Sequence, residues 1–69
     1  MKSIKWTNKY SKETGFVKCL AKGHFINTFD PGEAMKFKTI KEADKTLDRL
    51  YEFGEDANNE FTVIESPKA

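Results

Sequence analysis

The chain has 69 residues and a net charge of +1; 38% of its residues are hydrophobic, 13% aromatic and 33% charged. This length gives room for one small core, so we expect a single α+β domain over residues 1–69, with 66–69 as a disordered tail. The composition is too apolar for a disordered protein, and the lone cysteine, Cys19, excludes an internal disulfide and a cysteine-based metal site.

The first half of the chain has the residue patterns of strands. Residues 4–7 predict a first strand, and 12–15 turn the chain into a second strand at 16–20. A third strand is expected at 24–29, because Gly23 supplies the positive φ that a hairpin turn needs. Residues 30–33 (Asp-Pro-Gly-Glu) have turn chemistry. For residues 33–38 we expect either a short fourth strand, from the alternation at 35–38, or a turn of helix.

The strongest local signal is a helix over residues 40–53. Thr39 and Glu42 match a capping box, in which the Thr39 hydroxyl accepts from the Glu42 amide. Gly54 follows where a left-handed cap is favoured. The apolar positions form one helical stripe at Ile40, Ala43, Leu47, Leu50 and Tyr51. Acidic residues repeat at every fourth position, as is typical of a solvated helix face, at Asp44, Asp48 and Glu52.

Residues 61–65 are rich in strand formers and precede Pro67, so they predict the last strand. The expected order is β-β-β-(β)-α-β. The fold class is therefore α+β, with an antiparallel-rich sheet of four or five strands and one helix packed on one face.

The register of the central hairpin decides which side chains lie under the helix. A two-residue loop at Lys22-Gly23 places Val17, Cys19 and Ile26 on one face; a three-residue loop at 21–23 gives a different partition. In the two-residue register the other face carries Phe16, Lys18, Leu20, Phe25, Asn27 and Phe29. One helix covers only one face, so this second face is a candidate binding surface for a protein target or for a second copy as a homodimer. The alternative is that the first strand and the termini fold over these rings.

Nothing in the sequence predicts catalysis. His24 is the only histidine and follows a turn glycine, while Cys19 lies on a strand that we expect to be buried. The glycines are dispersed and form no phosphate-binding loop, and the acidic segment 55–60 lacks the spacing of a calcium loop. We therefore expect no enzyme, no catalytic residue, no cofactor and no metal.

The charge distribution supports an alternative function. Residues 1–28 carry six lysines and one acidic residue, whereas 29–69 carry six Lys/Arg and ten Asp/Glu. Basic residues interleaved with rings are typical of single-stranded nucleic-acid binding. The candidate residues are Lys5, Trp6, Lys9, Tyr10, Lys12, Lys18 and Lys22. The scarcity of arginine and the lack of an RNA-binding signature make this the weaker alternative.

The start of the sequence lacks the apolar run of a signal peptide, and no stretch has the apolar length of a membrane span. With a single cysteine, these features favour a cytoplasmic protein.

Four segments carry a resemblance: 13–18 (Glu-Thr-Gly-Phe-Val-Lys), 23–26 (Gly-His-Phe-Ile), 37–39 (Phe-Lys-Thr) and 61–65 (Phe-Thr-Val-Ile-Glu). Together they resemble small uncharacterised proteins of bacteriophages and mobile elements from Gram-positive hosts. The resemblance covers most of the chain and includes no catalytic motif. It implies a stand-alone modulator that binds and inhibits a host or defence protein, of the anti-restriction or anti-CRISPR type.

Overall fold

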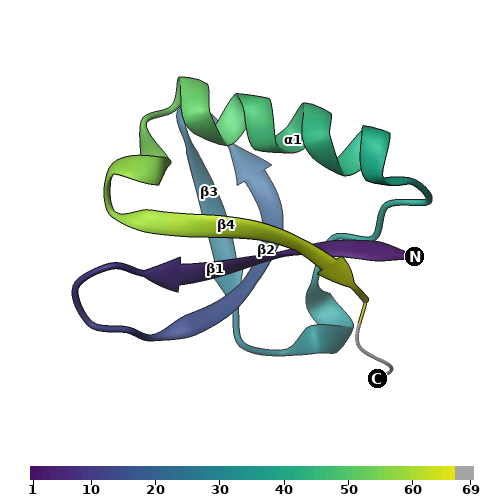
Figure 1. Cartoon of the computed structure of the whole chain (residues 1–69), viewed down its shortest axis with the longest axis horizontal. Coiled ribbons are helices and arrows are strands. Elements are labelled where there is room, and N and C mark those ends of the chain that lie inside the picture. The colour runs from purple at the N-terminus through teal and green to yellow at the C-terminus, as the bar shows by residue number, and fades with distance from the viewer. Residues whose placement is uncertain (67–69) are drawn as a thin grey trace.

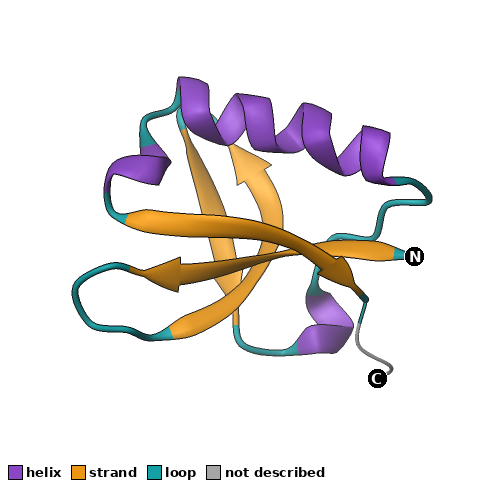
Figure 2. Ribbon diagram, in the orientation of Figure 1, coloured by secondary structure: helices purple, strands orange, loops and turns teal. Residues whose placement is uncertain are grey.

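The computed structural model describes residues 1–66. These residues form strands β1 (Lys2–Asn8), β2 (Thr14–Ala21), β3 (His24–Thr28) and β4 (Asn59–Glu65), helix α1 (Ile40–Glu52), and the short 3₁₀ turns η1 (Pro31–Glu33) and η2 (Glu55–Ala57) (Figure 1). The strands make one antiparallel sheet in the order β3-β2-β1-β4, and α1 packs on one face of it (Figure 2). The expected α+β class is confirmed.

Local signals set the two ends of α1, as predicted. The Thr39 hydroxyl accepts from the Glu42 amide at 3.3 Å, which caps the first turn. The helix ends one residue earlier than predicted, with Phe53 as its cap, and Gly54 follows in the left-handed region at φ 80°. Ile40 and Tyr51, expected in the buried stripe, are instead 53% and 49% exposed, because they lie on the flank of the stripe at its two ends.

The β2–β3 hairpin has the two-residue loop, since Ala21 pairs with His24 and Gly23 has a φ of 80°. A β-bulge then shifts the register: Cys19 pairs with Ile26, but Val17 pairs with Asn27. The extra residue between them is Lys18. Because side chains alternate along a strand, one extra residue makes every side chain on the far side of the bulge point to the opposite face of the sheet.

The core lies between α1 and the sheet. Its buried members are Ile4, Trp6, Val17, Phe37, Ala43 and Leu50. The sheet is strongly coiled around this core, because Phe25 and Phe61 come from its two outer strands and yet their rings meet edge to face at 5.4 Å between centroids. The coiling is visible in Figure 2, where β2 and β3 cross β1 and β4 at a steep angle.

The optional strand before the helix is reduced to one bridge, between Lys2 and Phe37. η1 precedes it, and the Met35 amide then donates to the Val17 carbonyl at 3.0 Å. β2 pairs with β1 only up to Phe16 and then curves away. Residues 35–37 therefore fill the gap between two diverging strands, and neither strand offers them an extended row of hydrogen bonds.

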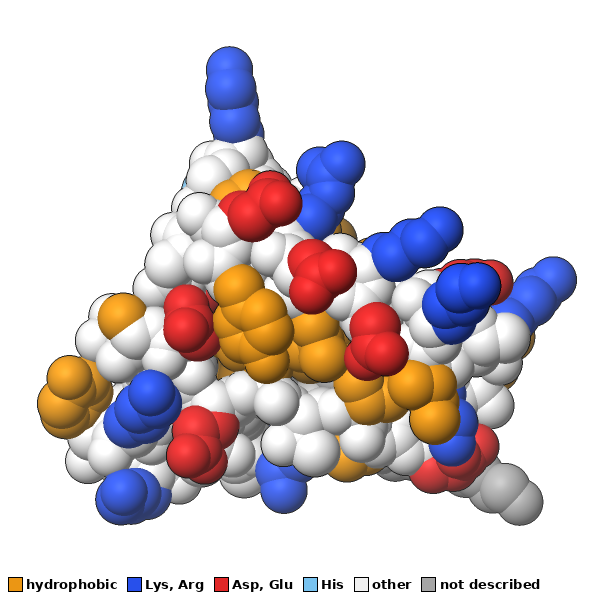
Figure 3. All heavy atoms as spheres, turned by 45° about the horizontal axis from the view of Figure 1, so that its top comes forward, with side chains coloured by type: hydrophobic (Ala, Val, Ile, Leu, Met, Phe, Trp, Pro, Cys, Tyr) orange, Lys and Arg blue, Asp and Glu red, His pale blue; other side chains and the backbone are white. Residues whose placement is uncertain are grey.

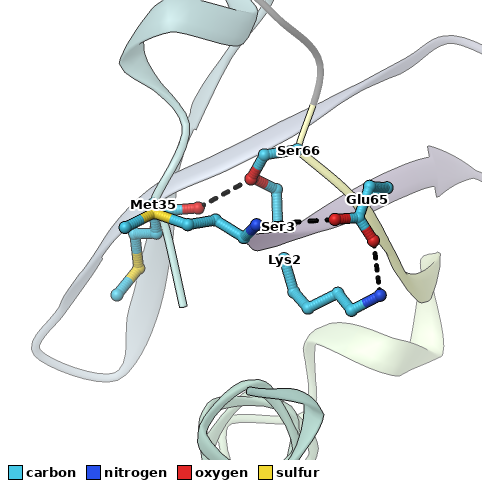
Figure 4. Close-up of polar contacts among 6 residues, drawn as sticks. Lys2, Ser3, Met35, Glu65 and Ser66 are labelled. Carbon is cyan, nitrogen blue, oxygen red and sulfur yellow. Dashed lines mark hydrogen bonds and ion pairs between the residues drawn. The ribbon is translucent and has the colours of Figure 1, made fainter. Parts of the chain in front are cut away.

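The end of β4 is held against the start of β1 (Figure 4). The Ser66 amide donates to the Met1 carbonyl at 2.8 Å, and its hydroxyl lies 2.6 Å from that of Ser3. The Glu65 carboxylate pairs with the Lys2 ammonium and with the N-terminal ammonium. Ser66, expected in the disordered tail, is thus part of the fold; residues 67–69 lie outside the described residues.

Over residues 1–66, no helix combines the length and the apolar character that crossing a membrane requires.

Candidate partner-binding surface

The structure divides the second sheet face that the sequence predicts. Leu20 and Phe25 pack against the core on the side of Val17, beneath the helix. Phe16 precedes the bulge and pairs with Lys5 of β1, so it points to the opposite side. The prediction of one continuous aromatic face is therefore wrong, and the extra residue in β2 is the physical reason.

The remaining residues of that predicted set are exposed; Asn27 and Phe29 both lie near Trp6, whereas Lys18 lies apart from them. The Lys18 ammonium contacts the Glu33 carboxylate at 3.1 Å, and both side chains are about half exposed. Phe29 follows β3 and is 63% exposed, with its ring edge-on to Trp6. Asn27 lines a pocket of about 410 Å³ together with Trp6, Asn8, Ser11, Glu13, Phe25, Glu55 and Asn59.

The candidate nucleic-acid residues are also dispersed. Trp6 is only 5% exposed, and its indole N–H donates to the Phe16 carbonyl at 3.1 Å, so its ring is not free to stack on a base. Tyr10 is 76% exposed in the β1–β2 loop, close in sequence to Lys9 and Lys12. The other basic residues lie elsewhere: Lys22 in the β2–β3 turn, Lys5 on β1 and Lys18 on β2 (Figure 1).

The side chains considered for chemistry lie at the surface. Cys19 is exposed, contrary to the expectation of a buried thiol, because the bulge turns it away from Val17. The exposed His24 ring donates through Nδ1 to the Lys22 carbonyl at 3.1 Å. Among residues 1–66, no group of three or more His, Cys, Asp or Glu side chains is placed to hold a metal ion.

A surface that the sequence did not predict lies along β4, an outer strand of the sheet. β4 pairs with β1 from Asn59 to Glu65, and hydrogen bonds from Lys9 to Asn58 and from Ser66 to Met1 flank this ladder. In an antiparallel pair, successive residues of a strand direct their N–H and C=O groups alternately toward the partner strand and away from it. The even-numbered β4 residues therefore bond to β1, whereas the N–H and C=O groups of Phe61, Val63 and Glu65 point away from it. These outward N–H and C=O groups make no hydrogen bond within the described residues. They form a free strand edge.

An apolar strip lies beside this edge, where α1 runs antiparallel to β4 (Figure 1). Ile40 and Tyr51 are half exposed at its two ends. Leu47, Phe61 and Val63 are half buried between them. Figure 3 shows hydrophobic side chains gathered below the helix. Tyr51 also lines a pocket of about 320 Å³ with Lys9, Asp56, Asn59, Glu60, Phe61 and Thr62.

Carboxylates flank the strip. Asp44, Asp48 and Tyr51 follow each other at spacings of four and three residues, so they share the flank of α1 that faces β4. In Figure 3 a row of acidic side chains lies between the central hydrophobic patch and the basic side chains above it. The residues that line the pocket beside Tyr51 include two acidic ones, Asp56 and Glu60, and one basic one, Lys9. We call the strip, its carboxylates and the free edge the α1–β4 surface.

The chain matches no protein-family model, and neither the curated proteins nor the solved structures contain a significant match to it.

Proposed function

We propose that this chain is a non-enzymatic binding protein, which uses the α1–β4 surface to bind and inhibit a host or defence protein. The observation that carries this proposal is a free strand edge beside uncovered apolar side chains. The resemblance to small phage and mobile-element proteins supports the inhibitory role, and the single cysteine favours a cytoplasmic setting.

The physical basis is the combination of features. One exposed apolar side chain is ordinary on a protein surface. An unpaired strand edge invites pairing with another chain, and here it lies next to an exposed aromatic ring. Tyrosine is also among the residues that dominate binding energy at interfaces. An inhibitor that acts by occupying its target needs only such a surface and no catalytic group.

Two matched tyrosines allow a direct test. Tyr51 is 49% exposed on the α1–β4 surface, and Tyr10 is 76% exposed in the β1–β2 loop. Purified wild type, Tyr51→Asp and Tyr10→Asp are used as baits in a nuclease-treated bacterial lysate. We expect a stoichiometric protein partner with wild type and with Tyr10→Asp, and its loss with Tyr51→Asp. Circular dichroism confirms that each variant is folded.

The inhibitory role is tested on the isolated partner, whose activity should fall to a plateau at one equivalent of the chain. A partner that disappears after nuclease treatment would instead support nucleic-acid binding. Retention of the partner by Tyr51→Asp would contradict the use of the α1–β4 surface. Catalytic turnover by the chain alone would contradict a non-enzymatic role.

A further inference from the structure

We propose that the α1–β4 surface accepts an extended segment of the target, rich in lysine or arginine, as a fifth strand hydrogen-bonded to β4. This inference rests on the proposed function and specifies the mode of binding and the chemistry of the bound segment.

The backbone of β4 supplies the register. Phe61, Val63 and Glu65 each direct one N–H and one C=O outward, along a strand seven residues long. An added strand can form hydrogen bonds with these outward N–H and C=O groups without any change in the existing sheet. This is the mode in which main-chain hydrogen bonds contribute affinity and alternate side chains contribute specificity.

The side chains of the added strand alternate between two different environments. Those on the helix side meet the apolar strip, where Ile40 and Tyr51 are half exposed. Those on the other side of the sheet meet the face of β4 that carries Thr62 and Ile64. The helix-side positions are therefore the ones that the α1–β4 surface can select.

The charged side chains around the apolar strip determine which side chains of the added strand fit the helix-side positions. Asp44 and Asp48 lie on the flank of α1 facing β4, and Asp56 lies at the pocket beside Tyr51. A lysine or arginine can lay its aliphatic stem on the apolar strip and place its cationic head among these carboxylates. The exposed Tyr51 ring adds a face for the same cation.

The same charges argue against a second copy of the chain on this edge. A two-fold axis pairing β4 with its own copy places identical surfaces together. The Asp44 and Asp48 row of one copy would then approach that of the other, and like charges across a strand pair are unfavourable. A basic segment of a different protein has the complementary charge.

The first experiment measures binding of two labelled, capped eight-residue peptides by fluorescence anisotropy. One alternates valine with lysine, and the other alternates valine with glutamate. We expect the lysine peptide to bind and the glutamate peptide to bind at least about tenfold more weakly. The lysine peptide should lose affinity by about two- to tenfold in the double variant Asp44→Asn/Asp48→Asn. The control Glu13→Gln/Glu42→Gln removes two exposed carboxylates elsewhere and should leave the affinity unchanged.

A second experiment tests the backbone. A chemically synthesised chain with an N-methyl group on Val63 lacks one outward N–H and keeps every side chain. Its circular dichroism should match wild type, while its affinity for the lysine peptide should be lost. Equal binding of the two peptides, unchanged affinity of Asp44→Asn/Asp48→Asn, or unchanged affinity after N-methylation would each overturn strand addition by a basic segment.

The outcomes separate this inference from the proposed function. A protein partner that binds wild type and Asp44→Asn/Asp48→Asn equally well overturns the basic-strand mode and leaves the proposed function standing. A lysate that contains no protein partner overturns the proposed function, whereas the peptide titration still decides whether the edge accepts a basic strand.

Discussion

Gly15 lies on β2 directly opposite Trp6, and its lack of a side chain is what lets the indole ring cross the strand. A Cβ atom at this position would lie 2.7 Å from Cζ2 of Trp6 and 2.9 Å from the Thr28 carbonyl oxygen. The ring cannot retreat easily, because its N–H is bonded to the Phe16 carbonyl and Phe29 packs against it. Gly15→Ala should therefore overpack the core.

Overpacking of this kind costs about 1–3 kcal/mol. In a domain of this size, each kcal/mol lowers the melting temperature by roughly 4–8 °C. Urea and thermal unfolding followed by circular dichroism measure the effect. The cost should shrink in a Trp6→Phe background, since the smaller ring lacks the contacting atoms. Gly23→Ala is the control, because Gly23 has a positive φ but no atom within 4 Å of its added Cβ. Its destabilisation should therefore be independent of Trp6, and in the double variant it should simply add to the destabilisation caused by Trp6→Phe. A Gly15→Ala variant that is neutral, or more stable by the roughly 0.4–1 kcal/mol expected from a stiffer unfolded chain, would refute the close approach.

Three further predictions concern the helix cap, a terminal ion pair and the free thiol. Thr39→Ala should lower the free energy of unfolding by about 0.5–2 kcal/mol in urea titrations, because it removes the acceptor of the Glu42 amide. The hydrogen bond and charge of Lys2, with the N-terminal ammonium, hold the pKa of Glu65 below its ordinary value of 4.5. The ionised carboxylate therefore stabilises the fold above pH 4.5, and this contribution is lost as the pH falls through the lowered pKa. Glu65→Gln should have a lower melting temperature than wild type at pH 7 and the same melting temperature in strong acid. Cys19 should react fully with a thiol reagent in the native protein, and Cys19→Ser should change the stability by less than about 0.5 kcal/mol.

Each of these has a clear contrary result. Thr39→Ser keeps a hydroxyl acceptor and should retain most of the stability, so equal losses for Thr39→Ala and Thr39→Ser would argue against capping. The Glu65 effect should weaken in high salt, because the carboxylate is exposed; a melting difference that persists in acid would exclude the ion pair as its cause. A thiol that reacts only after unfolding would place Cys19 in the core.

Local chemistry made one part of the fold predictable. The helix follows from a hydroxyl at Thr39, a glycine at position 54 and an apolar stripe between them, all within one segment of the chain. The two-residue hairpin loop is also a local matter, because Gly23 provides the positive φ next to Lys22.

The bulge in β2 has no comparable local signal. The Val17 carbonyl bonds to the Met35 amide, and Lys18 pairs with Glu33, so the contacts around it come from a segment more than a dozen residues away. One undetected residue exchanged the faces of Leu20 and Cys19. The predicted partner-binding face depended on this register.

The α1–β4 surface was not predicted for a different reason. The spacing of Asp44 and Asp48 is the same on a solvated helix face as on the rim of a binding surface. What distinguishes the two is the strand beside the helix. β4 pairs with β1 and so ends the sheet, and this pairing joins segments more than fifty residues apart.

Residue-resolved amide hydrogen exchange along β4 tests the free edge most directly. In the protein alone, Glu60, Thr62 and Ile64 should be protected by their bonds to β1, while Phe61, Val63 and Glu65 should exchange quickly. On saturation with the valine–lysine peptide, the three fast amides should become protected and the other three should change little. Uniform protection of β4 in the protein alone, or an unchanged alternation with the peptide bound, would contradict a β4 edge that is free to receive a strand.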